Sequence, residues 1–223
     1  MFTECITESE WLDIRRHHIA SSEVAAALGL SKWKSPYTLW AEKTRRVEPR
    51  DTTISMRVRY ELEDLIVELY KETQLDLVNI SNPGDYTVLM RPEWPFLSCT
   101  LDRVIHAEDV DIPLELKTTS RRDAETWRAG DPPIEAVAQI QIRMLLMGAP
   151  RGVLAALVDG ADFVIVDVDR DQPFLDAAIP KLRQFWNLVH GGNPPEIDGS
   201  DSTRETIGGI GLNRRERQNG GRK

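Results

Sequence analysis

The chain has 223 residues, of which 41% are hydrophobic, and this composition suits one compact domain with a substantial core. Its formal net charge of −8 excludes a broadly basic surface, so any contact with nucleic acid would have to come from local clusters of Lys and Arg. Its two cysteines and four scattered histidines exclude a disulfide framework and a zinc site held by sulfur and imidazole, so a bound metal should be a hard cation held by oxygen.

The first third of the sequence predicts helices. Ser21 and Ser22 precede an apolar stretch over residues 24–30 and would cap a short helix there. Ser35 and Pro36 suit the start of a second helix, because proline is tolerated in the first turn. Residues 54–73 carry apolar side chains three and four positions apart, which predicts a longer helix with one apolar face.

Predicted strands and helices alternate through the rest of the sequence. Turn-forming residues separate three segments that we interpret as strands, at residues 86–90, 96–105 and 112–119. Residues 134–147 predict a helix, residues 152–158 and 163–168 a hairpin, and residues 173–190 a last helix. This order predicts an α/β fold with a central mixed β-sheet flanked by helices.

The two ends of the sequence are polar. The N-terminal residues lack the apolar segment of a secretory signal, and the longest apolar run, residues 153–158, is too short to cross a bilayer. We therefore expect a cytoplasmic protein with no membrane association. From Gly199 onward the sequence is Gly-rich and poor in apolar residues, so we expect a single domain over residues 1–198 and a flexible tail over residues 199–223.

The most informative segment is LELK at residues 114–117. Side chains alternate between the two faces of a strand, so Leu114 and Leu116 would point into a core while Glu115 and Lys117 lie side by side on the other face. One interpretation is an ion pair on a solvated face. The other is a functional site.

Asp102 favours the functional site. It lies thirteen residues before Glu115, on the preceding predicted strand, so both carboxylates can face one point beside Lys117. Mg²⁺ is commonly bound by one or two protein carboxylates and keeps several waters. The spacing Asp–x₁₂–Glu–x–Lys is the pattern of the PD-(D/E)XK nucleases, although this bare pattern is only moderately specific.

Further segments carry a resemblance to one family. Residues 19–24 (IASSEV), 29–36 (GLSKWKSP), 92–97 (PEWPFL), 115–118 (ELKT) and 138–141 (AQIQ), together with Arg15 and Leu62-Glu63, occur in that family's order. On these residues the chain resembles the phage lambda exonuclease and YqaJ-like viral recombinase family, over most of its length. Arg59 and Arg103 stand where the family usually has glycine.

The resemblance implies a restriction-endonuclease-like PD-(D/E)XK core over residues 1–198 and a metal site within it. Asp102 and Glu115 would be the principal Mg²⁺ ligands, and the backbone carbonyl of Leu116 a third. Glu63 would reach the site from its helix and help to bind a second ion. Mn²⁺ would substitute for Mg²⁺. Without the resemblance, Glu63 would be interpreted as part of a solvated helix face.

The resemblance also implies roles for four other residues. Lys117 would position or activate the attacking water, and Gln139 would face the site from the following helix. Arg15 and Ser22 would bind the 5′-phosphate of the strand being digested, as suits an arginine and a hydroxyl near a helix N-terminus. Taken singly, Gln139 would be an ordinary helix residue, Ser22 a helix cap and Arg15 a surface charge.

The family suggests a Mg²⁺-dependent exonuclease that digests double-stranded DNA from 5′ to 3′ and leaves single strands for homologous recombination. The expected partners are double-stranded DNA ends and a recombinase that anneals or pairs strands. The family also suggests a homo-trimer, acting in a bacterial host cytoplasm if the chain is phage-encoded.

Other functions remain open. An endonuclease of the same superfamily would use the same carboxylates and lysine on internal sites, and a catalytically silent protein could bind DNA ends or act as an adaptor. A small-molecule enzyme is disfavoured because no phosphate-binding glycine loop follows a predicted strand. Basic clusters at residues 43–46, at Arg121-Arg122 and in the tail are candidates for the DNA contact.

Overall fold

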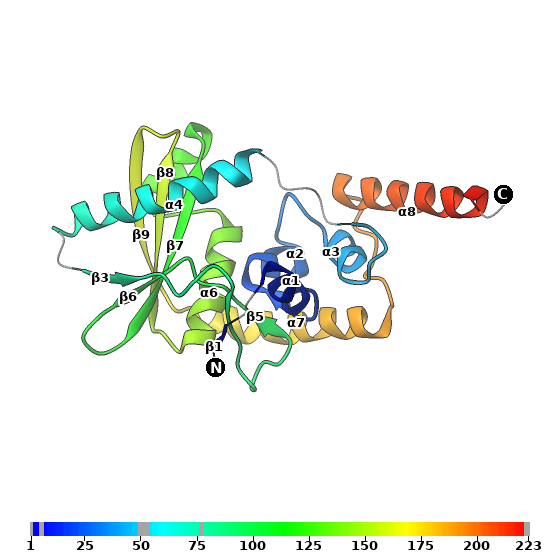
Figure 1. Cartoon of the computed structure of the whole chain (residues 1–223), viewed down its shortest axis with the longest axis horizontal. Coiled ribbons are helices and arrows are strands. Elements are labelled where there is room, and N and C mark those ends of the chain that lie inside the picture. The colour runs from blue at the N-terminus through cyan, green and yellow to red at the C-terminus, as the bar shows by residue number, and fades with distance from the viewer. Residues whose placement is uncertain (1, 5–6, 49–53, 76–77, 221–223) are drawn as a thin grey trace.

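The structure is a computed structural model that describes residues 2–4, 7–48, 54–75 and 78–220. Within these residues the largest sheet has five strands in the order β3-β6-β7-β8-β9 (Figure 1). Its strands are β3 (Asn79–Ser81), β6 (Arg103–His106), β7 (Asp111–Thr119), β8 (Arg151–Val158) and β9 (Asp162–Asp169). Strands β7 and β8 run parallel and the other neighbours antiparallel, so the predicted mixed sheet is confirmed.

One helix covers each face of this sheet. Helix α4 (Ile54–Thr73) places Ile66 and Tyr70 against Leu114 and Leu116 of β7. Helix α6 (Ile134–Met147) packs on the opposite face, against alternate residues of β8. Gly148 ends α6 in the left-handed conformation that glycine adopts readily, with a φ of 78°. The alternation of side chains along β7 therefore separates an α4 face from an α6 face.

Four other helices and a 3₁₀ turn pack on the far side of α6 (Figure 1). They are α1 (Glu8–Arg16), the 3₁₀ turn η1 (Ser21–Glu23), α2 (Val24–Ala27), α3 (Pro36–Lys43) and α7 (Gln172–Gly191). Apolar residues of α2, α3 and α7 form one buried cluster with Ala138, Ile142 and Leu145 of α6. Helix α6 is thus enclosed on both sides, which explains why nearly all of its residues are buried.

Several predicted elements need correction. The segment predicted as one strand over residues 96–105 forms two, β5 (Leu97–Ser98) and β6, with Asp102 in the bend between them. The strand predicted at residues 86–90 is β4 (Thr87–Leu89), which pairs with β1 (Phe2–Glu4) outside the central sheet. The sequence analysis missed α1, β1, β3 and β2 (Ile19–Ala20), which pairs with β5, as well as η2 (Arg121–Asp123) and α5 (Ala124–Arg128).

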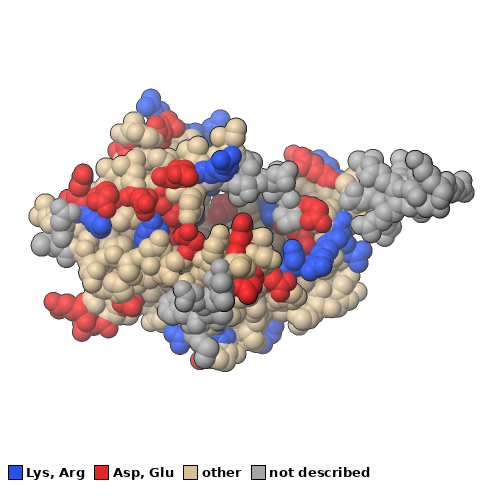
Figure 2. All heavy atoms as spheres, viewed as in Figure 1, with Lys and Arg blue, Asp and Glu red and all other residues tan. Residues whose placement is uncertain are grey.

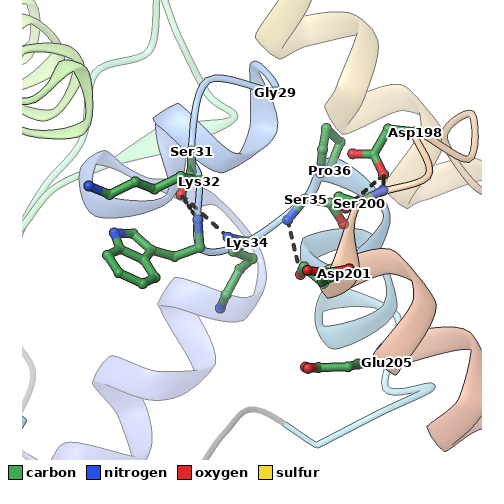
Figure 3. Close-up of a pocket in the computed structure, with 12 residues that line it drawn as sticks. Gly29, Ser31, Lys32, Lys34, Ser35, Pro36, Asp198, Ser200, Asp201 and Glu205 are labelled. Carbon is green, nitrogen blue, oxygen red and sulfur yellow. Dashed lines mark hydrogen bonds between the residues drawn. The ribbon is translucent and has the colours of Figure 1, made fainter.

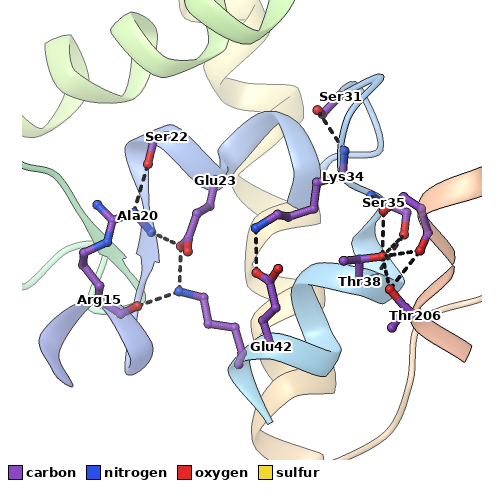
Figure 4. Close-up of polar contacts among 12 residues, drawn as sticks. Arg15, Ala20, Ser22, Glu23, Ser31, Lys34, Ser35, Thr38, Glu42 and Thr206 are labelled. Atoms are coloured by element: carbon purple, nitrogen blue, oxygen red, sulfur yellow. Dashed lines mark hydrogen bonds and ion pairs between the residues drawn. The ribbon is translucent and has the colours of Figure 1, made fainter. Parts of the chain in front are cut away.

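Residues 199–223, which the sequence analysis expected to form a flexible tail, include helix α8 (Asp201–Gly220). Its first turns dock on α3 through hydroxyl groups (Figure 4). Thr203 Oγ1 is 2.7 Å from Ser35 Oγ, and Thr206 Oγ1 is 2.7 Å from Thr38 Oγ1. An apolar pattern could not reveal this contact, because the buried surface is polar. The basic residues at 214–217 and 222–223 lie outside the side chains that the structure describes.

None of the helices in the described part of the chain has both the length and the apolar character needed to cross a membrane.

Candidate active site

Strand β7 brings Glu115 and Lys117 to the α6 face of the sheet. Their partners in the parallel register are Leu154 and Ala156 of β8, which pack against α6. Glu115 is only 1% exposed. The interpretation as an ion pair on a solvated face is therefore wrong for Glu115, whose carboxylate lies inside the protein.

Asp102 joins Glu115 because β6 and β7 are antiparallel neighbours. Arg103 lies opposite Leu114 in that pairing, so the bend before β6 places Asp102 beside the middle of β7. The backbone N–H of Leu116 donates a hydrogen bond of 2.9 Å to Asp102 Oδ2. The predicted convergence of the two carboxylates is thus present in the structure.

Lys117 and Gln139 complete the predicted catalytic group. Lys117 Nζ donates hydrogen bonds to Glu115 Oε1 at 2.5 Å and to Gln139 Oε1 at 3.0 Å. Gln139 projects from α6 and is 8% exposed, so its amide is fixed by this contact and by packing. Four residues from three separate segments therefore meet at one place.

Arg143, one helical turn after Gln139, also enters this group, and the sequence analysis did not identify it. Its guanidinium is buried, donates to Asp102 Oδ1 at 2.9 Å through Nη2, and forms an ion pair with Glu115 Oε2 through Nη1. A charged residue inside the apolar stretch 134–147, four positions after Gln139, is the signal that could have identified it.

Burial and neighbouring charges shift the pKa values of the two carboxylates in opposite directions. Burial raises the pKa of Glu115 above its usual range, in spite of the neighbouring Arg143. Burial also acts to raise the pKa of Asp102, but the positive charges of Arg143 and Lys117 outweigh it and lower that pKa. Asp102 is therefore the more readily ionised of the pair.

Glu63 lies near this group but is bound to another arginine. Arg103 donates to Asp64 Oδ1 at 2.7 Å and to the Asp102 carbonyl at 2.6 Å, and it lies 3.4 Å from Glu63 Oε2. Partial burial and the charge of Asp102 raise the pKa of Glu63 to about 7. Glu63 is thus close to the predicted metal ligands, with Arg103 balancing its charge.

The residues present fit a hard cation. Glu115 Oε2 is buried and accepts no hydrogen bond from any described residue, although Arg143 Nη1 pairs with it by charge. Among the described residues, no three Asp, Glu, His or Cys side chains are grouped to hold a metal by themselves. Asp102 and Glu115 would be the protein donors, a set that suits Mg²⁺ with several of its waters retained. The role of the Leu116 carbonyl stays a prediction.

Arg15 and Ser22 meet at the predicted phosphate site. Arg15 Nη2 donates to Ser22 Oγ at 3.2 Å (Figure 4). The Arg15 guanidinium also stacks on Trp11, 4.7 Å from the ring centre. Ser22 belongs to η1, which packs against α6. The helix that carries Gln139 and Arg143 thus adjoins the turn that carries Ser22.

Lys43 does not provide the basic surface that the sequence suggested. Its Nζ is buried, pairs with Glu23 Oε2 at 2.6 Å and donates to the Arg15 carbonyl at 2.6 Å (Figure 4). It therefore holds the backbone of Arg15 in place.

Charged side chains of both signs are distributed over the face in Figure 2, with a recess near the N-terminal end of α4 in which acidic atoms are visible. This view matches the net negative charge.

A separate cavity of about 410 Å³ lies between the loop before α3 and the start of α8 (Figure 3). Its lining includes the cationic Lys32 and Lys34 and the anionic Asp198 and Asp201, and Trp33, which also lines it, is 72% exposed. The predicted catalytic residues do not belong to its lining. Its mixed charge does not favour a polyanion.

Comparison with known proteins supports the resemblance. The sequence matches the YqaJ-like viral recombinase domain family over residues 10–150. It is 31% identical to the protein YqaJ of Bacillus subtilis (strain 168) over 207 residues, which are 91% of this chain and 63% of that protein. The structure resembles that of the alkaline exonuclease LHK-Exo from Laribacter hongkongensis, with a TM-score of 0.68 and 18% identity, covering 82% of this chain and 93% of that one. For LHK-Exo in complex with dAMP the TM-score is 0.67, at 17% identity and the same coverage.

The match over residues 10–150 shows that the chain belongs to the YqaJ-like viral recombinase domain family, as its motifs predicted. Its fold resembles that of the alkaline exonuclease, so the predicted α/β fold with a central mixed sheet is also confirmed. The chain spans 63% of the length of the Bacillus relative.

Proposed function

We propose that this chain is a Mg²⁺-dependent exonuclease that hydrolyses double-stranded DNA from its 5′ ends. The observation that carries the proposal is the convergence of Asp102, Glu115, Lys117 and Gln139 on the α6 face of the sheet. The fold shared with an alkaline exonuclease supports the same reaction class.

Each residue of the site has a chemical task in this proposal. Asp102 and Glu115 hold Mg²⁺ through carboxylate oxygens, and Glu63 contributes to a second ion. When bound, Mg²⁺ supplies a nucleophilic hydroxide and charge stabilisation on the phosphate. Lys117 Nζ neutralises the scissile phosphate and orients the attacking water, and Gln139 Oε1 fixes the position of that ammonium.

Selection of a DNA end is assigned to Arg15 and Ser22. A guanidinium and a hydroxyl 3.2 Å apart can both donate to one terminal phosphate. An endonuclease would not need such a pair. We therefore favour an exonuclease over an endonuclease with the same carboxylates.

We further propose that the resulting single strands pass to a recombinase that anneals or pairs them in a bacterial cytoplasm, and that three copies of the chain assemble around DNA. Family membership supports the link with recombination. Light scattering of the purified protein with and without duplex DNA measures the assembly, and a monomer in both conditions would contradict the trimer.

Digestion of linear duplex DNA labelled at the 5′ or the 3′ end, with Mg²⁺ or with EDTA, tests the reaction. We expect Mg²⁺-dependent loss from the 5′ ends, intact closed circles, and a rate on the order of 10²-fold lower for Lys117→Ala. The control is Lys181→Ala on the exposed face of α7, which should cleave like the wild type. Cut circles would identify an endonuclease. Folded protein that cleaves neither substrate with Mg²⁺ or Mn²⁺ would leave a protein that only binds DNA ends.

A further inference from the structure

Arg143 is a charged residue between buried apolar residues of α6. Its neighbours on α6, Ile142 and Met144, are fully buried, and Arg143 itself is only 4% exposed. A guanidinium is costly to bury unless charged partners compensate for the lost water. Asp102 and Glu115 provide this compensation, since the guanidinium pairs with a carboxylate oxygen of each.

The contacts of Arg143 select one oxygen from each carboxylate. Asp102 Oδ2 already accepts the Leu116 N–H, and Glu115 Oε1 already accepts Lys117 Nζ. The other two oxygens, Asp102 Oδ1 and Glu115 Oε2, face the guanidinium. The guanidinium therefore lies between the two oxygens that a cation shared by both residues would contact.

The pairing between Arg143 and Glu115 is one of charge rather than of directed hydrogen bonding. Glu115 Oε2 and Arg143 Nη1 form an ion pair, yet neither atom has a hydrogen bond with suitable geometry within the described residues. This oxygen could exchange the guanidinium for another cation without losing a well-formed hydrogen bond. Asp102 would lose one, at 2.9 Å.

We propose that Arg143 is the resident cation of this site, and that a divalent ion binds only by displacing its guanidinium from between Asp102 and Glu115. The inference rests on the proposed metal-dependent function. In this arrangement Arg143 keeps two neighbouring carboxylates compatible with a folded protein when no metal is bound, and it lowers the affinity of the site for metal.

Replacement of Arg143 by a neutral residue should therefore have two opposite effects. Without metal, Asp102 and Glu115 repel each other more strongly once the guanidinium between them is gone, so the melting temperature falls. With metal, the competing cation is gone and the more negative site attracts a divalent ion more strongly. If Arg143 had a purely structural role, its replacement would lower stability without tightening metal binding, because the metal site would be weakened together with the fold.

The experiment is a calorimetric titration of metal-free protein with Mn²⁺, together with thermal unfolding followed by circular dichroism in EDTA and in Mn²⁺. For Arg143→Gln we expect binding of Mn²⁺ about tenfold tighter than in the wild type and a larger rise in melting temperature on adding Mn²⁺. Arg143→Lys should give an intermediate affinity, because one ammonium lacks the planar fork that spans two carboxylates.

Arg91→Gln is the matched control. Arg91 also contacts α6, where it donates to the Leu146 and Met147 carbonyls, but it touches neither carboxylate in the described contacts. Its replacement should lower the melting temperature and leave Mn²⁺ affinity as in the wild type. This result would separate loss of an arginine from loss of the resident cation.

Mn²⁺ affinity equal to or weaker than wild type in Arg143→Gln would overturn the inference. If Arg143→Gln folds only with Mn²⁺, that metal-induced folding supports the inference. In that case Arg143→Lys decides, and a Mn²⁺ affinity equal to or weaker than wild type in Arg143→Lys overturns the inference. DNA digestion by the same samples is scored separately. DNA cleavage without tighter Mn²⁺ binding in the variants would overturn this inference alone. Tighter Mn²⁺ binding in the variants without DNA cleavage would overturn the proposed function alone. If no protein binds Mn²⁺, both the inference and the proposed metal site are overturned.

Discussion

Polar groups are buried in two regions of this molecule for different reasons. Around α6 the buried groups are charged: burial raises the pKa of Glu115, whereas the charges of Asp102 and Glu115 raise the pKa of Arg143 against the effect of burial. Between α3 and α8 they are neutral hydroxyls, with Thr203 fully buried and hydrogen-bonded to Ser35. Buried charges are expensive and cluster at functional sites, whereas paired hydroxyls cost little. The first region is therefore the candidate for chemistry, and the second is a means of docking a helix.

The largest expected effect comes from Glu115→Gln, which keeps the shape of the side chain and removes its charge. We expect the rate of DNA digestion to fall on the order of 10³-fold, because a principal metal ligand and the partner of Lys117 are lost together. The rate with labelled linear duplex measures this. Glu125→Gln, at an exposed position of α5, is the control and should digest DNA normally. Equal rates for the two variants would remove Glu115 from the catalytic site.

Thr203→Val tests the hydroxyl region and should affect stability but not activity. The substitution removes the hydroxyl that contacts Ser35 and Asp198. We therefore expect the free energy of unfolding, measured in urea, to fall by about 1–3 kcal/mol. The digestion rate should match that of the wild type below the transition. Thr126→Val, at an exposed site, should change stability by less than about 0.5 kcal/mol. Lost activity in a folded Thr203→Val protein would contradict the division between the two regions.

Arg15→Ala tests an exposed polar contact that we assign to function. We expect about a tenfold loss of the preference for 5′-phosphorylated over 5′-hydroxyl ends, since a charge-assisted hydrogen bond to the terminal phosphate disappears. Competition between the two substrates measures the preference. Arg16→Ala is the neighbouring control, because Arg16 pairs with Asp13 on the surface. The same loss in both variants would indicate general electrostatic attraction instead of a specific phosphate site.

The smallest expected effect is a pH dependence from His18, whose Nδ1 donates a hydrogen bond of 2.8 Å to the Ile14 carbonyl near the phosphate site. Burial, with a contribution from Lys43, lowers the pKa of His18 below its ordinary value of 6.5. As the pH falls through 6.5, the unfolded chain takes up a proton before the folded protein does, so stability decreases. Urea unfolding at pH 7.5 and about pH 5.5 should show a larger decrease for the wild type than for His18→Gln.

His17→Gln provides the control for this prediction. His17 makes a similar contact, to the Asp13 carbonyl at 2.8 Å, but its side chain is exposed. Its replacement should leave the pH dependence of the wild type in place. The same pH dependence in His18→Gln would show that other groups cause it.

The sequence by itself determined the elements with strong periodic patterns and which residues are candidates for catalysis. Helices α4, α6 and α7 and the β8–β9 hairpin follow from apolar spacing, with turn residues at their ends. The alternation along β7 and the position of Asp102 predicted the convergence with Glu115 and Lys117. Strand geometry is local, so a short segment of sequence is enough to specify which side chains share a face.

Only the tertiary structure decided which charges surround those residues and where the tail lies. Arg143 contacts Asp102, which lies 41 residues away along the chain. Arg103 contacts Asp64 and Glu63, which lie 39 and 40 residues away. Helix α8 docks through hydroxyls about 168 positions from Ser35 and Thr38. Ion pairs and hydroxyl contacts have no periodic signature, because they depend on where distant segments meet, and the burial that gives them their energetic weight exists only in the folded chain.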